Sequence, residues 1–210
     1  MGMFSLLLET KWPISLDRLA EKAKEILPGR DVSDDLRKFW RERLQSFWER
    51  EHPVLLVRAS ILSDSEWLPT IQGRLRFLST APSRAQWEGV SSLYTRLVNI
   101  LPKGGNDVSL PIDETRISEA PERKILQLLV ETGLYPENGW GDLAQRGDWE
   151  VLWERATRFV EPVERFFEEI LVNDPDPVLR SSRLGLLLRL LNGLEHIGRL
   201  NLLSAPSREG

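Results

Sequence analysis

The sequence contains no cysteine and only two histidines among its 210 residues. Without cysteine the chain cannot form a disulfide, use a thiol nucleophile or bind zinc through thiolates, and a reducing compartment such as the cytoplasm fits this composition. His52 precedes a proline and His196 lies in an amphipathic segment, so neither histidine belongs to a zinc-ligand spacing. The sequence therefore predicts no metal site and a cytoplasmic location.

Long apolar runs and phosphate-binding loops are also missing. No run of about 18 apolar residues occurs, so no membrane span is expected. No GxSxG, GxGxxG or Walker-type loop is present, and residues 102–105 follow a helical pattern, which favours a helix stop over a phosphate loop. Paired carboxylates such as Glu168 and Glu169 lie on polar faces or at helix starts, where solvation and capping explain them better than catalysis. We expect no catalytic residue and no cofactor bound by this chain.

The composition is that of a soluble globular protein, with 41% apolar and 29% charged residues. The net charge of −4 argues against a broad surface that coats nucleic acid. It leaves room for a local RNA site, because phosphate contacts need only one basic face. The eight tryptophans are expected mainly in the core or between helices.

Apolar residues recur with helical spacing along most of the chain, and no stretch of strict alternation suggests a strand. The sequence therefore predicts an all-α helical bundle. Val54 and Val57 are expected on the inward face of the segment that follows Pro53. The expected helices span residues 15–27, 33–51, 53–62, 67–78, 83–101, 118–132, 148–159, 162–172 and 176–203, with a mobile connection at 106–116 and a loop at 135–147.

The segment from Pro162 to Leu203 organises these predictions. Asp176 and Pro177 provide a capping side chain and a first-turn proline for the last long helix. Arg180 and Arg183, three residues apart, are expected together on its polar side near its N-terminus. This basic pair could bind an anion. Alternatively, it could form salt bridges with neighbouring acids such as Asp174 and fix the helix corner.

Three segments resemble the C-terminal part of the β subunit of bacterial heterotetrameric glycyl-tRNA synthetase. They are Phe39-Trp40-Arg41-Glu42-Arg43-Leu44, then Leu93 to Leu101, and then Phe166-Phe167 with the acidic turn 174–176 and Leu179-Arg180-Ser181-Ser182-Arg183-Leu184. The sequence departs from the family at Ser182, where Asn is usual, and at Asn173, where Met is frequent.

This resemblance implies an anticodon-binding helical domain of the class I type shared with arginyl-tRNA synthetase. It implies that residues 1–30 end a preceding helical domain, 31–204 form the anticodon-binding domain, and 205–210 are a frayed tail. The partners would be glycine tRNA and the synthetase α subunit, which would carry the ATP- and Mg²⁺-dependent ligation of glycine. On this interpretation the chain is a C-terminal piece of a longer subunit and holds none of the catalytic residues.

The resemblance also implies five candidate residues for tRNA contact: Arg96, Asn99, Lys103, Arg180 and Arg183. Two other interpretations stay open. A helical module that contacts only protein would show no RNA affinity, and an anticodon-binding domain of another synthetase, such as the arginyl enzyme, would share the fold.

Overall fold

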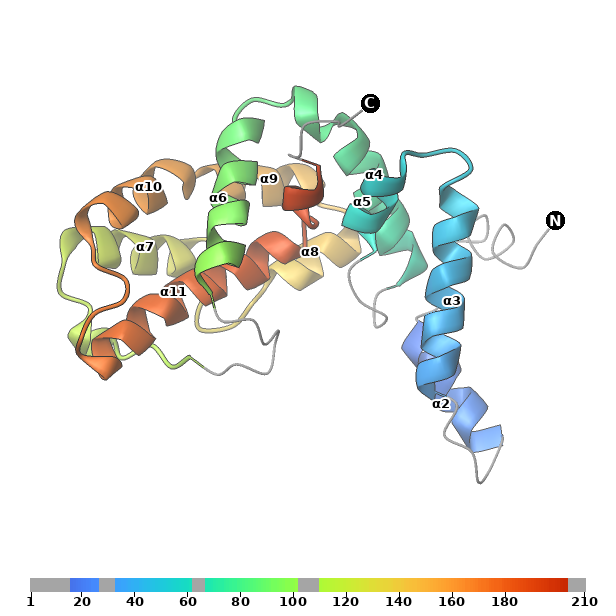
Figure 1. The fold of residues 1–210 in the computed structure, drawn as a ribbon, viewed down its shortest axis with the longest axis horizontal. Coiled ribbons are helices and arrows are strands. Elements are labelled where there is room, and N and C mark those ends of the chain that lie inside the picture. Colours follow the sequence, from blue (N-terminus) through green and yellow to red (C-terminus); the bar gives the residue numbers. More distant parts are fainter. Residues whose placement is uncertain (1–15, 27–32, 62–66, 102–109, 204–210) are drawn as a thin grey trace.

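The computed structural model describes residues 16–26, 33–61, 67–101 and 110–203 (Figure 1). These residues form α-helices and short 3-10 turns, and none of them forms a β-strand, which confirms the predicted all-α class. The helices are α2 (Leu16–Ile26), α3 (Ser33–Trp48), α4 (Val54–Ser60), α5 (Leu68–Thr80), α6 (Trp87–Ile100), α7 (Ala120–Glu131), α8 (Trp140–Arg146), α9 (Trp149–Thr157), α10 (Val160–Glu169) and α11 (Pro177–Glu195), with 3-10 turns η1 (Ala81–Ser83), η3 (Glu114–Arg116) and η4 (Leu200–Leu202).

Helix α11 is the central element of the fold, and its position follows from its apolar spacing. Leu186, Leu187, Leu190 and Leu194 have no exposed surface. The helix packs against α6 and α7, and α10 packs against the same two helices, so these four helices form one half of the molecule (Figure 1). Helices α4, α5, α8 and α9 supply much of the remaining core, with η4 lying between α4 and α6.

The predicted loop at residues 135–147 is wrong, because this segment contains α8. The helix begins at Trp140, whose backbone N–H donates to the Asn138 side chain at 3.1 Å. The Trp140 indole is fully buried and donates from Nε1 to the Thr132 carbonyl at 2.8 Å. A short helix that buries one aromatic side chain shows little apolar periodicity. The glycines of this segment therefore predicted a loop.

Two further details differ from the sequence prediction. Val54 is 44% exposed, and Leu56 takes the inward position beside Val57. Helix α6 begins at Trp87 instead of Ser83, because η1 and the left-handed Gln86 (φ 61°) precede it. Most of the tryptophans that the structure describes are buried, as expected: Trp48, Trp87, Trp140 and Trp153.

A buried arginine connects the ends of two helices. Arg74 of α5 has no exposed surface, donates from Nε to the His196 carbonyl at 2.9 Å, and donates from Nη1 to the Ser60 carbonyl at 2.8 Å. Ser60 ends α4 and His196 follows α11, so one side chain satisfies carbonyls that helix ends leave without intrahelical partners. This contact fixes α11 against the α4–α5 half.

Helices α2 and α3 pack against each other and lie beside this core (Figure 1). Contact with α4 joins α3 to the rest of the described core. Among the α3 side chains whose burial the structure describes, Leu44 and Trp48 are buried. The predicted domain boundary after residue 30 stays a prediction, and the predicted tail at 205–210 lies outside the described residues.

Candidate functional site

The outer face of α6 forms an open groove of about 620 Å³. The helix turns its apolar residues inward, with Val90 and Leu97 fully buried. The opposite residues repeat at helical spacing and are mostly polar, which places them along one solvent-facing side. The groove is lined by Trp87, Glu88, Ser91, Ser92, Thr95, Arg96, Asn99 and Leu203. Two of the five candidate residues, Arg96 and Asn99, therefore lie in one groove.

Arg96 is held in place by an aromatic ring. Its guanidinium carbon lies 3.9 Å from the centroid of the Phe167 ring of α10, within the range of a cation–π contact. The Arg96 side chain is exposed, and it pairs with no carboxylate among the residues that the structure describes. Its position is thus defined by stacking while its N–H donors stay free for an anion or a base.

Asn99 lies one helical turn beyond Arg96 on the same face and is exposed. Its side-chain amide makes no hydrogen bond within the described part of the chain, so a donor and an acceptor are available beside the Arg96 guanidinium. Lys103, the third candidate in this region, lies outside the described residues.

Arg183 lies in a second place, the corner between α10 and α11. We expected it on the polar side of α11, and this is wrong, since only 6% of its surface is exposed. Its Nε donates to Glu122 of α7 at 2.5 Å, and its Nη1 donates to the Asp174 carboxylate at 2.9 Å and to the Leu171 carbonyl at 2.8 Å. The contact with Asp174 is the salt bridge predicted as the alternative to an anion site, whereas the contact with Glu122 was not predicted.

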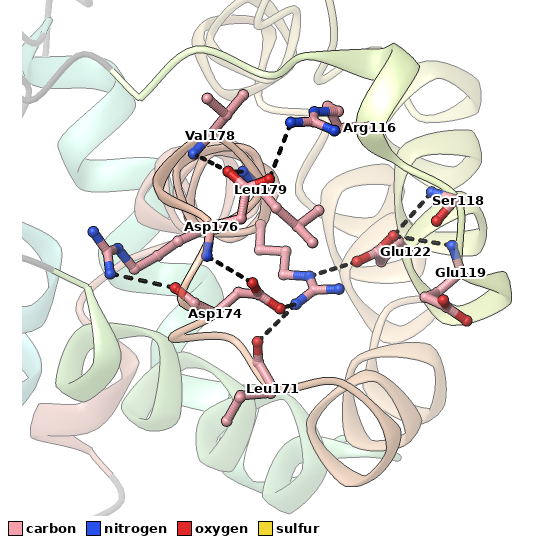
Figure 2. Close-up of polar contacts among 11 residues, drawn as sticks. Arg116, Ser118, Glu119, Glu122, Leu171, Asp174, Asp176, Val178 and Leu179 are labelled. Atoms are coloured by element: carbon pink, nitrogen blue, oxygen red, sulfur yellow. Dashed lines mark hydrogen bonds and ion pairs between the residues drawn. The ribbon is translucent and has the colours of Figure 1, made fainter.

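The carboxylates of this corner also organise the backbone around them (Figure 2). Glu122 is fully buried and accepts from the N–H groups of Ser118 and Glu119 at 3.1 and 3.0 Å, where α7 begins. Asp174 accepts from the N–H of Asp176 at 2.9 Å. The Arg183 side chain therefore joins the start of α7 to the turn before α11.

Asp176 is the N-cap of α11, as the sequence predicted. Its Oδ1 accepts from the N–H groups of Val178 and Leu179 at 2.9 and 3.4 Å, and these bonds lower the pKa of its carboxyl group (Figure 2). Arg116 donates to its Oδ2 at 3.0 Å.

Arg180, in the first turn of α11, is exposed and donates to the Asp174 carbonyl at 3.3 Å. The corner thus holds three arginines, Arg116, Arg180 and Arg183, and three carboxylates, those of Glu122, Asp174 and Asp176. The charges of the corner therefore cancel, whereas the Arg96 charge has no such compensation from a partner.

Sequence reasoning missed Glu122, Glu88 and the stacking role of Phe167. A glutamate three residues after the start of a helix signals a capping box, so Glu122 carried a local signal. Nothing in the sequence shows that Phe167 meets Arg96, because the two residues lie on different helices that only the fold brings together.

The described part of the chain contains no helix that could span a lipid bilayer. The same residues include no group of three or more His, Asp or Glu side chains placed to hold a metal ion.

The fold and the site define an all-helical domain with a polar surface groove. The chain is similar to proteins named glycine--tRNA ligase beta subunit. It is 25% identical over 208 residues to that of Pasteurella multocida, 26% over 209 residues to that of Trichlorobacter lovleyi, and 26% over 229 residues to that of Nitrosomonas europaea. These matches cover 97%, 95% and 98% of this chain, and they confirm the resemblance noted in the sequence.

The same matches cover only part of the relatives. The chain spans about 30% of the length of the curated relatives it matches. No protein-family model matches the chain.

Proposed function

We propose that this chain recognises the anticodon of glycine tRNA as part of a glycyl-tRNA synthetase β subunit. It would thereby support the ATP-dependent ligation of glycine to its tRNA in the cytoplasm. The α subunit would be its protein partner in a heterotetramer and would hold ATP and Mg²⁺. The helical fold and the relatives named glycine--tRNA ligase beta subunit support this assignment.

The observation that carries the RNA interaction is the Arg96 guanidinium stacked on Phe167 without a carboxylate partner among the described residues. A guanidinium that is already ordered loses less conformational entropy when it binds a phosphate or a base. Proteins read single-stranded RNA by stacking its unpaired bases on aromatic or guanidinium planes and by hydrogen-bonding their edges. Arg96 offers both modes, and the Asn99 amide beside it adds hydrogen bonds.

The remaining candidates take secondary parts in this proposal. Lys103 and Arg180 would add phosphate contacts. Arg183 would act mainly by holding the corner from which Arg180 projects, because its guanidinium is already engaged by Glu122 and Asp174. The class I type of anticodon-binding bundle is part of the same proposal.

The test is filter binding of the 210-residue chain to a glycine tRNA transcript and to a transcript whose two anticodon cytosines are replaced, over a series of salt concentrations. We expect a preference for the native anticodon. Arg96→Ala should weaken binding by about tenfold and reduce the salt dependence by about one phosphate contact. The matched control is Arg76→Ala on α5, an exposed arginine outside the groove that should leave both unchanged.

Two results would contradict the proposal. Equal and steeply salt-dependent binding of both transcripts would indicate a general phosphate patch without anticodon recognition. Absence of binding at low salt would favour a helical module that contacts only protein.

A further inference from the structure

An acidic side chain lies in the same groove as Arg96, which is unexpected on a surface that meets RNA. Glu88, in the first turn of α6, is exposed and lines the groove. It forms no ion pair or side-chain hydrogen bond within the described residues. Eight residues separate it from Arg96, or about 12 Å along the helix. The groove therefore has a free carboxylate toward one end and a free guanidinium toward the other.

Two side chains that can donate hydrogen bonds, Ser92 and Trp87, line the same groove as Glu88. Ser92, one turn after Glu88, is exposed, and its hydroxyl has no partner in the described structure. The Trp87 indole stacks on Trp153 at 6.0 Å between ring centroids, and its Nε1–H makes no hydrogen bond to the described residues yet is not fully enclosed. Ser91 and Thr95 differ, because their hydroxyls donate to the carbonyls of Glu88 and Ser91. This end of the groove thus combines one charged acceptor with two unpaired donors.

We propose that the Glu88 end of the groove receives an unpaired cytosine base, with Glu88 as the residue that determines specificity. This inference rests on the proposed function, because glycine codons begin with two guanines and pair with two cytosines. Cytosine presents an amino donor at N4 beside acceptors at N3 and O2. Glu88 accepts from N4, and the Ser92 hydroxyl and the Trp87 indole N–H donate to the acceptors.

Uracil gives the contrast that makes Glu88 selective. It presents a carbonyl oxygen where cytosine has the amino group, so a carboxylate at that position faces an acceptor with an acceptor. When the bound base shields them from water, two facing acceptors, the Glu88 carboxylate and the uracil oxygen, cost free energy. Glu88 would thus favour cytosine by making the binding of uracil less favourable. A glutamine at position 88 could turn its amide and donate to that oxygen.

The comparison of binding to different RNAs separates this proposal from a purely electrostatic effect of Glu88. A carboxylate on an RNA-binding face repels every phosphate, so its removal would tighten binding to all RNA equally. If Glu88 reads a base, Glu88→Gln instead changes the ratio between two RNAs. The salt dependence of the ratio is small, because both RNAs carry the same phosphates.

The experiment measures binding of the 210-residue chain to the glycine tRNA transcript and to two transcripts in which one or the other anticodon cytosine is replaced by uracil. For the unmodified chain we expect the native transcript to bind more tightly than either variant. Glu88→Gln should lower this discrimination about tenfold at one of the two positions, mainly because the uracil transcript gains affinity. The control, Glu154→Gln, changes an exposed glutamate of α9 outside the groove and should keep the original ratios.

Retention of both ratios by Glu88→Gln, with all three transcripts binding more tightly, would overturn the inference and leave the proposed function standing. An unmodified chain that binds the three transcripts equally would overturn both. Circular dichroism should show unchanged folding of Glu88→Gln, because the side chain is exposed and makes no contact that the fold needs.

Discussion

Two arginines show how burial and pairing decide what a residue can do. Arg96 and Arg183 both come from segments that resemble the same family, and both were candidates for tRNA contact. Arg96 is exposed and backed by the Phe167 ring, whereas Arg183 is 6% exposed and bonded to two carboxylates. Loss of RNA binding after substitution of Arg183 would therefore not identify it as a contact, since the fold of the corner would change as well.

Arg183→Ala should destabilise the protein by about 3–5 kcal/mol, because it leaves the fully buried Glu122 carboxylate without its cation. Arg180→Ala is the matched control on the same helix. Its side chain is exposed and makes one long bond to a carbonyl, so the change should stay within about 0.5 kcal/mol. Urea unfolding followed by circular dichroism measures both. Similar losses for the two variants would contradict the structural role of the Arg183 pair.

At the scale of elements, α11 carries a glycine whose role is set by its neighbours. Gly185 is buried and faces residues 110–112, and an added Cβ would lie 2.8 Å from the Leu110 carbonyl oxygen and 2.9 Å from Ile112 Cγ1. Ser182, about one turn earlier on α11, also holds this stretch of chain, because its Oγ accepts a hydrogen bond from the Asp113 N–H at 3.0 Å. The expected mobile connection at residues 106–116 is thus packed against α11 in its described part, residues 110–116.

Gly185→Ala tests this packing through the sign of its effect. In an isolated helix alanine is more favourable than glycine by about 1 kcal/mol. Here the new methyl group meets a backbone carbonyl that cannot turn aside, so we expect a net destabilisation of about 1–3 kcal/mol. Ser181→Ala, one helical turn before Gly185, should be nearly neutral or slightly stabilising. The melting temperatures of both variants, compared with that of the unmodified chain, measure these effects. A higher melting temperature for Gly185→Ala would show that residues 110–112 are not packed on the helix.

At the scale of the whole molecule, stability is expected to be uneven along the chain. None of the side chains that the structure describes between Asp35 and Arg43 of α3 is buried. The helix is anchored to the core mainly through its second half, by the buried Leu44 and Trp48 and the partly buried Phe47, with the partly buried Trp40 just before them. Helix α11, in contrast, buries leucines on both sides of its axis against α6 and α7.

Hydrogen exchange should reveal this difference. Amides in the first half of α3 should exchange through local opening at a small fraction of the global unfolding energy, whereas amides between Leu186 and Leu194 should need global unfolding at about 5–15 kcal/mol. Mass spectrometry of peptic fragments at neutral pH measures both sets. Equal protection would mean that α3 belongs to the same cooperative unit as α11.

The sequence by itself determined the helical class, the order of most helices and several of their ends. These features depend on neighbours within one or two turns: apolar spacing, the Asp176 cap with Pro177, and the proline before α4. It also determined the family resemblance, which the relatives confirm.

Only the tertiary structure decided which polar residues are paired within the fold and which stay available to bind a ligand. Arg183 is engaged by Glu122, which lies 61 residues away in the sequence, and Arg96 is ordered by a ring on another helix. Helix α8 likewise exists because Trp140 finds a buried place and a carbonyl partner outside its own segment. No local pattern contains these pairings, because they arise where distant elements pack and water is excluded.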